Sequence, residues 1–81
     1  PRPAPASALL LRPCRAVHTA GMAYPIDVVF IARSGRVVRV CPQVGPWRIR
    51  LCRHAYAVAE LAAGEAARLG IAAGSRLRLP P

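Results

Sequence analysis

The sequence contains no lysine, no asparagine and only three acids, so its charge balance is one-sided. Twelve arginines against Asp27, Glu60 and Glu65 give 81 residues a formal net charge of +9. Such an excess points to a polyanionic partner: nucleic acid, an anionic membrane surface or an acidic protein. The arginines are scattered, however, and the composition, rich in Ala, Arg, Gly, Pro and Val, is typical of a GC-rich coding sequence. Charge alone therefore indicates an anionic partner without defining a site.

Cysteines and long apolar runs are also scarce. The three cysteines (Cys14, Cys41 and Cys52) are an odd number at wide spacings, which makes a poor disulfide framework. We expect reduced thiols that pack as small hydrophobic side chains. No apolar run approaches the roughly twenty residues that cross a bilayer, so no transmembrane segment is predicted. No signal-peptide pattern is present either. A cytoplasmic location is favoured for this chain, with export of a longer protein left open.

The chain is long enough for one small domain. Residues 1–7 alternate proline with small residues and Arg2. This composition favours an extended backbone and predicts a disordered lead-in. Residues 8–81 are predicted to form a single β domain. Because the chain starts at Pro1 rather than Met, we interpret it as an N-terminally truncated fragment.

Short apolar segments separated by turn residues indicate a mainly β fold. Ile26 to Arg33 is apolar on both faces, which predicts a strand covered from both sides. The Ser34-Gly35 turn predicts a hairpin with residues 36–41, ended by a loop from Pro42. Further strands are predicted over 8–12, 47–52, 55–61 and 76–79, and one short helix over 64–70. Five or six strands with one short helix near the C-terminus predict a small sandwich or barrel.

Apolar and basic residues alternate from Trp47 to Leu51. Because successive side chains of a strand point to opposite faces, we predict that Trp47, Ile49 and Leu51 face the core. Arg48 and Arg50 would then lie in water. A tryptophan flanked by arginines also resembles a stacking platform for single-stranded nucleic acid. The alternation favours the core position.

Ordered motifs across the chain resemble the domain-of-unknown-function 192 family of prokaryotic proteins. They are Pro13-Cys14, Val17-His18-Thr19, Met22, Pro25-Ile26-Asp27-Val28-Val29-Phe30, Gly35-Arg36-Val37-Val38, Pro46-Trp47-Arg48, Val58-Ala59-Glu60-Leu61-Ala62-Ala63-Gly64 and Leu69-Gly70-Ile71. The resemblance implies a compact, jelly-roll-like β domain with a short helix and no established activity. The chain departs from the family's pattern over residues 1–7, at Ala20 and at Gly74-Ser75. The first departure implies a missing opening strand, which would leave an open sheet edge.

Two acids lie in apolar segments, where a carboxylate is costly to bury. Asp27 and Glu60 must each be satisfied by an arginine, backbone amides, a histidine or a ligand, and a structural clamp is favoured over a ligand contact. If these groups bind a ligand, its site is a concave surface around His18, Met22, Asp27 and Glu60. An acid–base pair of Asp27 and Glu60 would need carboxylates about 5–10 Å apart.

Two cysteine–histidine pairs carry a further hypothesis. Cys14 with His18 and Cys52 with His54 would together complete a tetrahedral zinc shell. Neither spacing is a recognised zinc signature, so we favour buried thiols and predict no metal and no cofactor. Cys14 and His18 also match a nucleophile and its base, with Asp27 orienting the imidazole.

Three functions therefore stay open. A binding or accessory module rather than an enzyme is favoured. The first alternative is a nucleic-acid or anionic-surface binder, whose affinity would fall steeply with salt. It would use the arginines Arg48, Arg50, Arg53, Arg76 and Arg78. The second alternative is a Cys/His metal-binding or thiol-dependent enzyme.

Overall fold

The computed structural model describes residues 8–81, which form six short strands in two antiparallel sheets and one short helix. The larger sheet has the order β1-β6-β3-β4 and the smaller one pairs β2 with β5. The bounds are β1 Ala8–Leu11, β2 Ala16–His18, β3 Ile26–Ile31, β4 Val37–Val44, β5 Ile49–Leu51, β6 Ala57–Ala62 and α1 Glu65–Arg68. The prediction of a mainly β fold with one short helix near the C-terminus is confirmed.

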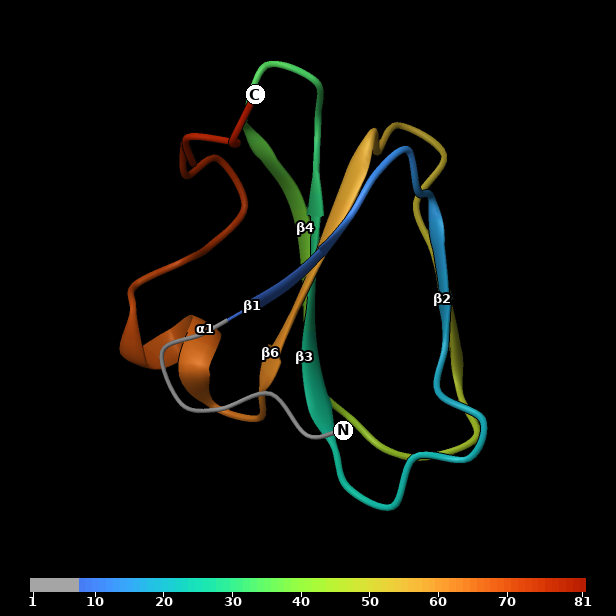
Figure 1. Ribbon diagram of the computed structural model, residues 1–81. Coiled ribbons are helices and arrows are strands. Elements are labelled where there is room, and N and C mark those ends of the chain that lie inside the picture. The colour runs from blue at the N-terminus through green and yellow to red at the C-terminus, as the bar shows by residue number, and fades with distance from the viewer. Residues whose placement is uncertain (1–7) are drawn as a thin grey trace.

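The domain has three layers (Figure 1). The four-stranded sheet stands in the middle, the β2–β5 sheet covers one face, and α1 with the C-terminal segment covers the other. No closed barrel forms among the described residues, and the jelly-roll-like connectivity stays a prediction. The predicted disordered lead-in over 1–7 lies outside the described residues. Within residues 8–81 no helix is long and apolar enough to cross a membrane.

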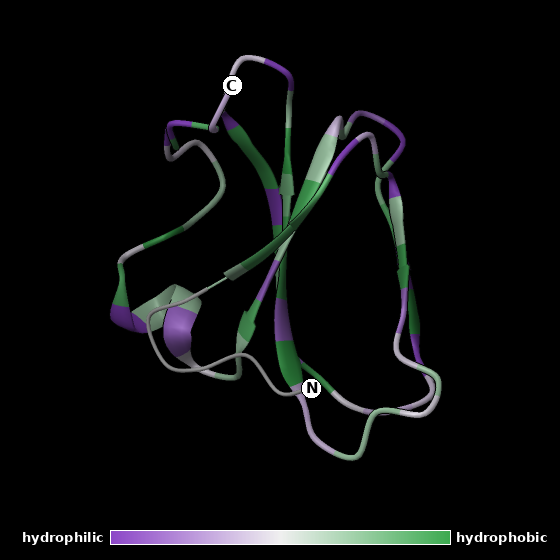
Figure 2. Ribbon diagram, in the orientation of Figure 1, coloured by the Kyte–Doolittle hydropathy of each residue, from purple (hydrophilic) through white to green (hydrophobic). Residues whose placement is uncertain are grey.

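Two apolar clusters fill the spaces between the layers. Figure 2 shows that the strands of the large sheet are built mainly from hydrophobic residues. The inner core lies between the two sheets and consists of Val17, Ile26, Val28, Phe30, Cys41, Val44, Ala55 and Val58. The helix-side core consists of Val29, Ile31, Val37, Ala57, Ala59, Leu61 and Ala66. Side chains of β3 alternate between the two cores, so all six of its residues are buried. The prediction of a strand covered on both faces is confirmed.

The β3–β4 hairpin is also confirmed, with Gly35 at a φ of 91° in its turn. The loop predicted from Pro42, Gly45 and Pro46 begins later than expected: Pro42 lies within β4, which continues to Val44, and Gly45 and Pro46 lie in the loop that follows. Pro42 is tolerated within β4 since β4 is the last strand of its sheet, where one row of backbone groups needs no ladder partner. The register between β3 and β4 shifts next to Gln43, whose φ is 49°.

Two short segments differ from the prediction. Residues 76–79 do not form a strand: only a single bridge joins Arg76 to Arg36. Leu77 and Leu79 instead pack against the helix-side core. Conversely, β2 is a strand that the sequence did not suggest, because Ala16–His18 carries one apolar core side chain, Val17.

The prediction that Trp47, Ile49 and Leu51 face the core is wrong. Trp47, Ile49 and Leu51 are 72%, 61% and 62% exposed, and Arg50 is half-buried. The turn before the strand sets this phase: Thr19 Oγ1 accepts a hydrogen bond from the Arg48 amide (2.8 Å) and donates one to the Gly45 carbonyl (2.8 Å). Because Arg50 stands opposite the core residue Val17, the residues on either side of Arg50 must point outward.

Candidate functional site

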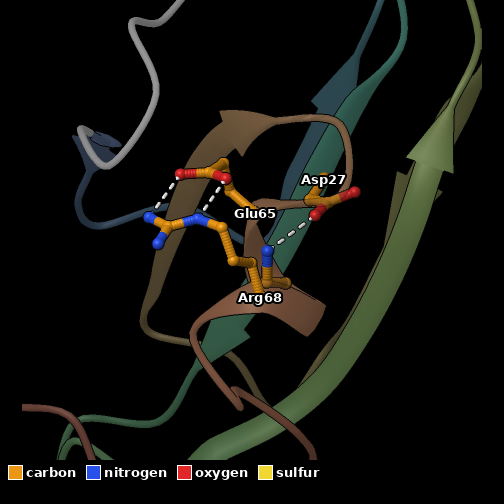
Figure 3. A network of polar contacts seen from close by, with 4 residues as sticks. Asp27, Glu65 and Arg68 are labelled. Atoms are coloured by element: carbon orange, nitrogen blue, oxygen red, sulfur yellow. Dashed lines mark hydrogen bonds and ion pairs between the residues drawn. The ribbon is translucent and has the colours of Figure 1, made fainter.

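Asp27 is a structural clamp between three elements. Its side chain leaves β3 on the helix side of the sheet and is 1% exposed. Oδ1 accepts a hydrogen bond from the Gln43 amide in β4 (2.9 Å), and Oδ2 accepts one from the Ala66 amide at the start of α1 (2.8 Å; Figure 3). Backbone amides are thus the partners that this buried carboxylate required.

The pair Glu65 and Arg68 lies next to this clamp (Figure 3). Arg68 Nε donates to Glu65 Oε2 (2.7 Å) and Nη2 donates to Oε1 (2.8 Å), a two-pronged contact along α1. The hydrogen bond to Glu65 raises the pKa of the Arg68 guanidinium. Glu65 is buried and Arg68 is exposed, so the arginine covers the carboxylate on the surface of the helix.

Glu60 faces the other way. It lies opposite Val28 in the β3–β6 pair, and its neighbour Val58 belongs to the inner core, so its side chain points between the two sheets. Burial raises the pKa of its carboxyl group, because the charged form loses hydration. No hydrogen bond or ion pair connects Glu60 to another of the described residues. Ionisation of this group therefore costs stability.

The four predicted ligand residues do not share one surface. Asp27 and Glu60 point to opposite faces of the large sheet, which rules out their action as an acid–base pair. Met22 packs against the inner core. His18 is exposed on the outer face of β2. The sequence placed these residues close together along neighbouring strands, but strand alternation separates their side chains.

The cysteine–histidine pairs do not converge either. Cys14 and Cys52 pack against the inner core, and the Cys14 thiol donates to the Ala16 carbonyl (3.2 Å). His18 points outward. No group of three or more His, Cys, Asp or Glu side chains within residues 8–81 is arranged to hold a metal ion. All three cysteines are free, as expected for thiols that pack as small hydrophobic groups.

A cleft rich in arginine lies at one end of the two sheets. Its volume is about 310 Å³. Three connections converge there: the one between β1 and β2, the β3–β4 turn, and the one between β5 and β6. The principal lining residues, called the arginine cleft below, are Pro13, Arg15, Arg33, Arg53, His54 and Tyr56.

Backbone hydrogen bonds hold the three connections together. The Cys14 amide donates to the Tyr56 carbonyl (2.9 Å), the Cys52 amide to the Arg15 carbonyl (2.9 Å), and the Tyr56 amide to the Ile31 carbonyl (2.8 Å). The Arg33 guanidinium stacks over the Tyr56 ring, with 4.2 Å to the ring centroid. These contacts give the cleft a fixed backbone frame from which the arginine side chains extend.

The charged side chains that line the cleft are all arginines. Three guanidinium groups and one imidazole surround it, and no carboxylate lines it. All three acids of the chain are buried elsewhere, at Asp27, Glu60 and Glu65. Such a concave cluster favours an anion, and arginine in particular suits the planar or tetrahedral oxygens of carboxylate and phosphate.

Sequence reasoning missed this site as a unit. It identified Arg53 as part of a basic surface and His54 as a weak metal candidate, but Arg15 and Arg33 drew no attention. The four side chains come from three turns far apart in the chain, so no local spacing connects them. One signal could have found the site: each of these four residues lies in a connection next to a strand end, and the connections meet at the same end of the sheets.

The chain is similar to two solved structures. A protein of unknown function from Novosphingobium aromaticivorans is 23% identical, with a TM-score of 0.78 over 89% of this chain and 56% of that one. A protein from Sinorhizobium meliloti, described as a "putative transcription regulator", is 27% identical, with a TM-score of 0.71 over 89% and 55%. The chain thus spans little more than half the length of either relative. A comparison with curated proteins gives no match.

One family model accounts for nearly all of the sequence. The model of DUF192, described as uncharacterized ACR, matches residues 3–79. Its match covers all six strands and the helix, and includes the segments around Cys14, Asp27 and Glu60. The chain belongs to the domain-of-unknown-function 192 family.

Proposed function

We propose that this domain is a binding module that holds an anionic group of the phosphate class in the arginine cleft. The observation that carries the proposal is the convergence of Arg15, Arg33, Arg53 and His54 on one concave site without a carboxylate. Guanidinium groups bind phosphate through paired, charge-assisted hydrogen bonds. A cleft of about 310 Å³ is at the lower end of the size range of small-molecule sites.

The proposal involves binding without a catalytic step. Cys14 packs inward and His18 points outward, so the predicted nucleophile and base do not face each other. Of the residues first considered as ligands, His18 is polar and exposed, but it lies on the outer side of β2, outside the arginine cleft, and is not proposed to contact the anion. Asp27 and Glu60 are proposed to be structural.

Titration with inorganic phosphate and pyrophosphate, followed by calorimetry, tests the cleft. We expect Arg53→Gln and Arg33→Gln each to weaken pyrophosphate binding roughly ten-fold or more, since a hydrogen bond to a charged group contributes about 1.5–3 kcal/mol. Arg78→Gln is the matched control, because Arg78 is exposed and lies outside the cleft. Equal affinity in all four proteins, or no heat of binding, would contradict the proposal.

Nucleic acid is the second candidate, and the description of the Sinorhizobium meliloti relative motivates it. The five arginines predicted for this role are divided between different layers. Arg48 and Arg50 flank or belong to β5, whereas Arg76 and Arg78 belong to the C-terminal segment on the other side of the large sheet. A single-stranded oligonucleotide titrated at two salt concentrations tests this candidate, because phosphate contacts make affinity fall steeply with salt.

A further inference from the structure

The outer face of the small sheet is apolar and uncovered. Paired residues of β2 and β5 place Ala16 beside Leu51 and His18 beside Ile49, all pointing away from the inner core. Trp47 lies two residues before Ile49, in the turn that leads into β5, and is also exposed. The outer face is defined here as Ala16, His18, Trp47, Ile49 and Leu51. None of these residues lines the arginine cleft.

This face is unusual within the described chain. Five large hydrophobic side chains are substantially exposed in residues 8–81, and Trp47, Ile49 and Leu51 are the three most exposed of them. They alternate with Arg48 and Arg50 along one short segment. A contiguous apolar patch with a polar border marks a contact surface more often than an accident of packing.

Charge complementarity argues against a second copy of the chain as the occupant. Each copy has a formal charge of +9, and all three of its acids are buried. Two outer faces brought together would bring the exposed Arg48 beside each face, and the net positive charge of both copies, close together. Like charges facing each other across an interface oppose association.

The charged residues next to the face also help to distinguish between possible partners. A protein partner presents charges of both signs, whereas the charged residues next to this apolar strip are all arginines. Nucleic acid is held by stacking on aromatic rings, and Ile49 and Leu51 offer none. A partner with an anionic surface over an apolar interior complements both the positive charge beside the face and the apolar side chains of the face. An anionic lipid bilayer has this composition.

We propose that the outer face docks on an anionic lipid surface. Trp47, Ile49 and Leu51 enter the boundary between headgroups and acyl chains, where the amphipathic indole is favoured. The exposed Arg48, between Trp47 and Ile49, pairs with headgroup phosphates, whereas Arg50 points to the inner side of β5 and donates to the Ile49 carbonyl (2.9 Å). Binding of this kind gains from apolar burial and from attraction to anionic lipids together.

The chain contains one tryptophan, so Trp47 is a native fluorescence probe placed at the proposed contact. The 81-residue chain is titrated with vesicles of phosphatidylcholine alone and with vesicles containing about one third phosphatidylglycerol. We expect a blue shift of Trp47 emission, and quenching by lipids with brominated acyl chains, only with the anionic vesicles. Unchanged emission with anionic vesicles would overturn the proposal.

A matched pair of variants tests the apolar contribution. The double change Ile49→Ser and Leu51→Ser is expected to weaken sedimentation with anionic vesicles roughly ten-fold or more, because both apolar contacts are lost. Leu69→Ser is the control, since Leu69 is 47% exposed beside α1, on the opposite side of the large sheet. Circular dichroism verifies that each variant is folded. Equal loss in both variants, or no loss in the double variant, would contradict docking through this face.

Two further results would favour another occupant. An oligonucleotide that produces the same blue shift as anionic vesicles would assign the face to nucleic acid. Concentration-dependent dimerisation that buries Trp47 would assign it to a second copy. The arginine cleft is tested separately, because Arg33→Gln leaves the outer face intact and changes pyrophosphate binding. Failure of either proposal therefore leaves the other one standing.

Discussion

At the scale of single residues, Asp27 connects the paired strands β3 and β4 to α1, which has no ladder of its own to either strand. One carboxylate oxygen accepts from the bulged end of β4 and the other from the first turn of α1. A four-residue helix has too few internal hydrogen bonds to be stable alone. The contact between Ala66 and Asp27 therefore holds α1 against the sheet, with Ala66 in the helix-side core.

Replacement of Asp27 by alanine is expected to lower the free energy of unfolding by about 3 kcal/mol, because two buried amides lose a charged acceptor. Urea denaturation measures this change. Asp27→Asn keeps one acceptor oxygen and is expected to cost less. Arg78→Ala removes an exposed side chain and is the control. An alanine variant as stable as the control would show that water replaces the carboxylate at both amides.

At the scale of elements, the C-terminal segment is attached to the β3–β4 turn by backbone contacts. The Leu77 amide donates to the Gly35 carbonyl (2.8 Å), and the Val37 amide donates to the Ser75 carbonyl (2.7 Å). A Cβ atom added at Gly35 would overlap the Leu77 carbonyl oxygen. The turn thus requires glycine at this position for space as well as for its φ of 91°.

Two glycine variants separate these requirements. Gly74 has a φ of 93°, but a Cβ there meets nothing within 4 Å. Gly74→Ala is expected to cost about 1–2 kcal/mol from backbone strain alone. Gly35→Ala is expected to cost about 1–3 kcal/mol more, because the C-terminal segment must move away from the turn. Urea denaturation of both variants measures the difference. Equal losses would mean that the segment adjusts without cost.

The same scale explains which elements the sequence could predict. The β3–β4 hairpin was predictable because apolar residues occupy both faces of Ile26–Ile31 and a turn follows at once. The side of β5 that faces the core was not predictable, because alternation indicates only that Trp47, Ile49 and Leu51 share a side. Which side is covered depends on Thr19, twenty-nine residues before the Arg48 it contacts.

The candidate sites divide in the same way. Asp27 was correctly expected to need a partner, since its strand is apolar on both sides, but its two amide donors come from segments 16 and 39 residues away. The arginine cleft needs the meeting of three connections, which only the strand order β1-β6-β3-β4 and the β2–β5 pairing produce. Local patterns contain neither kind of information.

At the scale of the whole molecule, the acidic side chains lie in the interior and the basic side chains lie on the surface. The three acids are buried, while eleven of the twelve arginines lie in the described residues and ten of these are exposed. The one ion pair among residues 8–81 is that of Glu65 with Arg68. The folded state therefore concentrates positive charge on the surface of a small body, measuring 32 × 25 × 21 Å along its principal axes.

Self-repulsion of this kind makes stability depend on salt. At about 0.01 M ionic strength the Debye length is about 30 Å, so arginines across the whole molecule repel one another. At about 0.1 M it is about 10 Å, and only near neighbours still interact. Because the expanded unfolded chain suffers less repulsion, sodium chloride is expected to raise the melting temperature over this range. A gain of about 1 kcal/mol corresponds to roughly 4–8 °C for a domain of this size.

Thermal unfolding at constant pH in rising sodium chloride measures this effect. Chloride is chosen because sulfate or phosphate would also stabilise the fold by binding to the arginine cleft, through linkage between ligand and folded state. Arg53→Gln separates the two contributions: it should reduce the extra stabilisation by phosphate and leave most of the response to chloride, since Arg53 is one charge of many. A melting temperature that falls with chloride would mean that attraction, rather than repulsion, dominates the charge interactions of the fold.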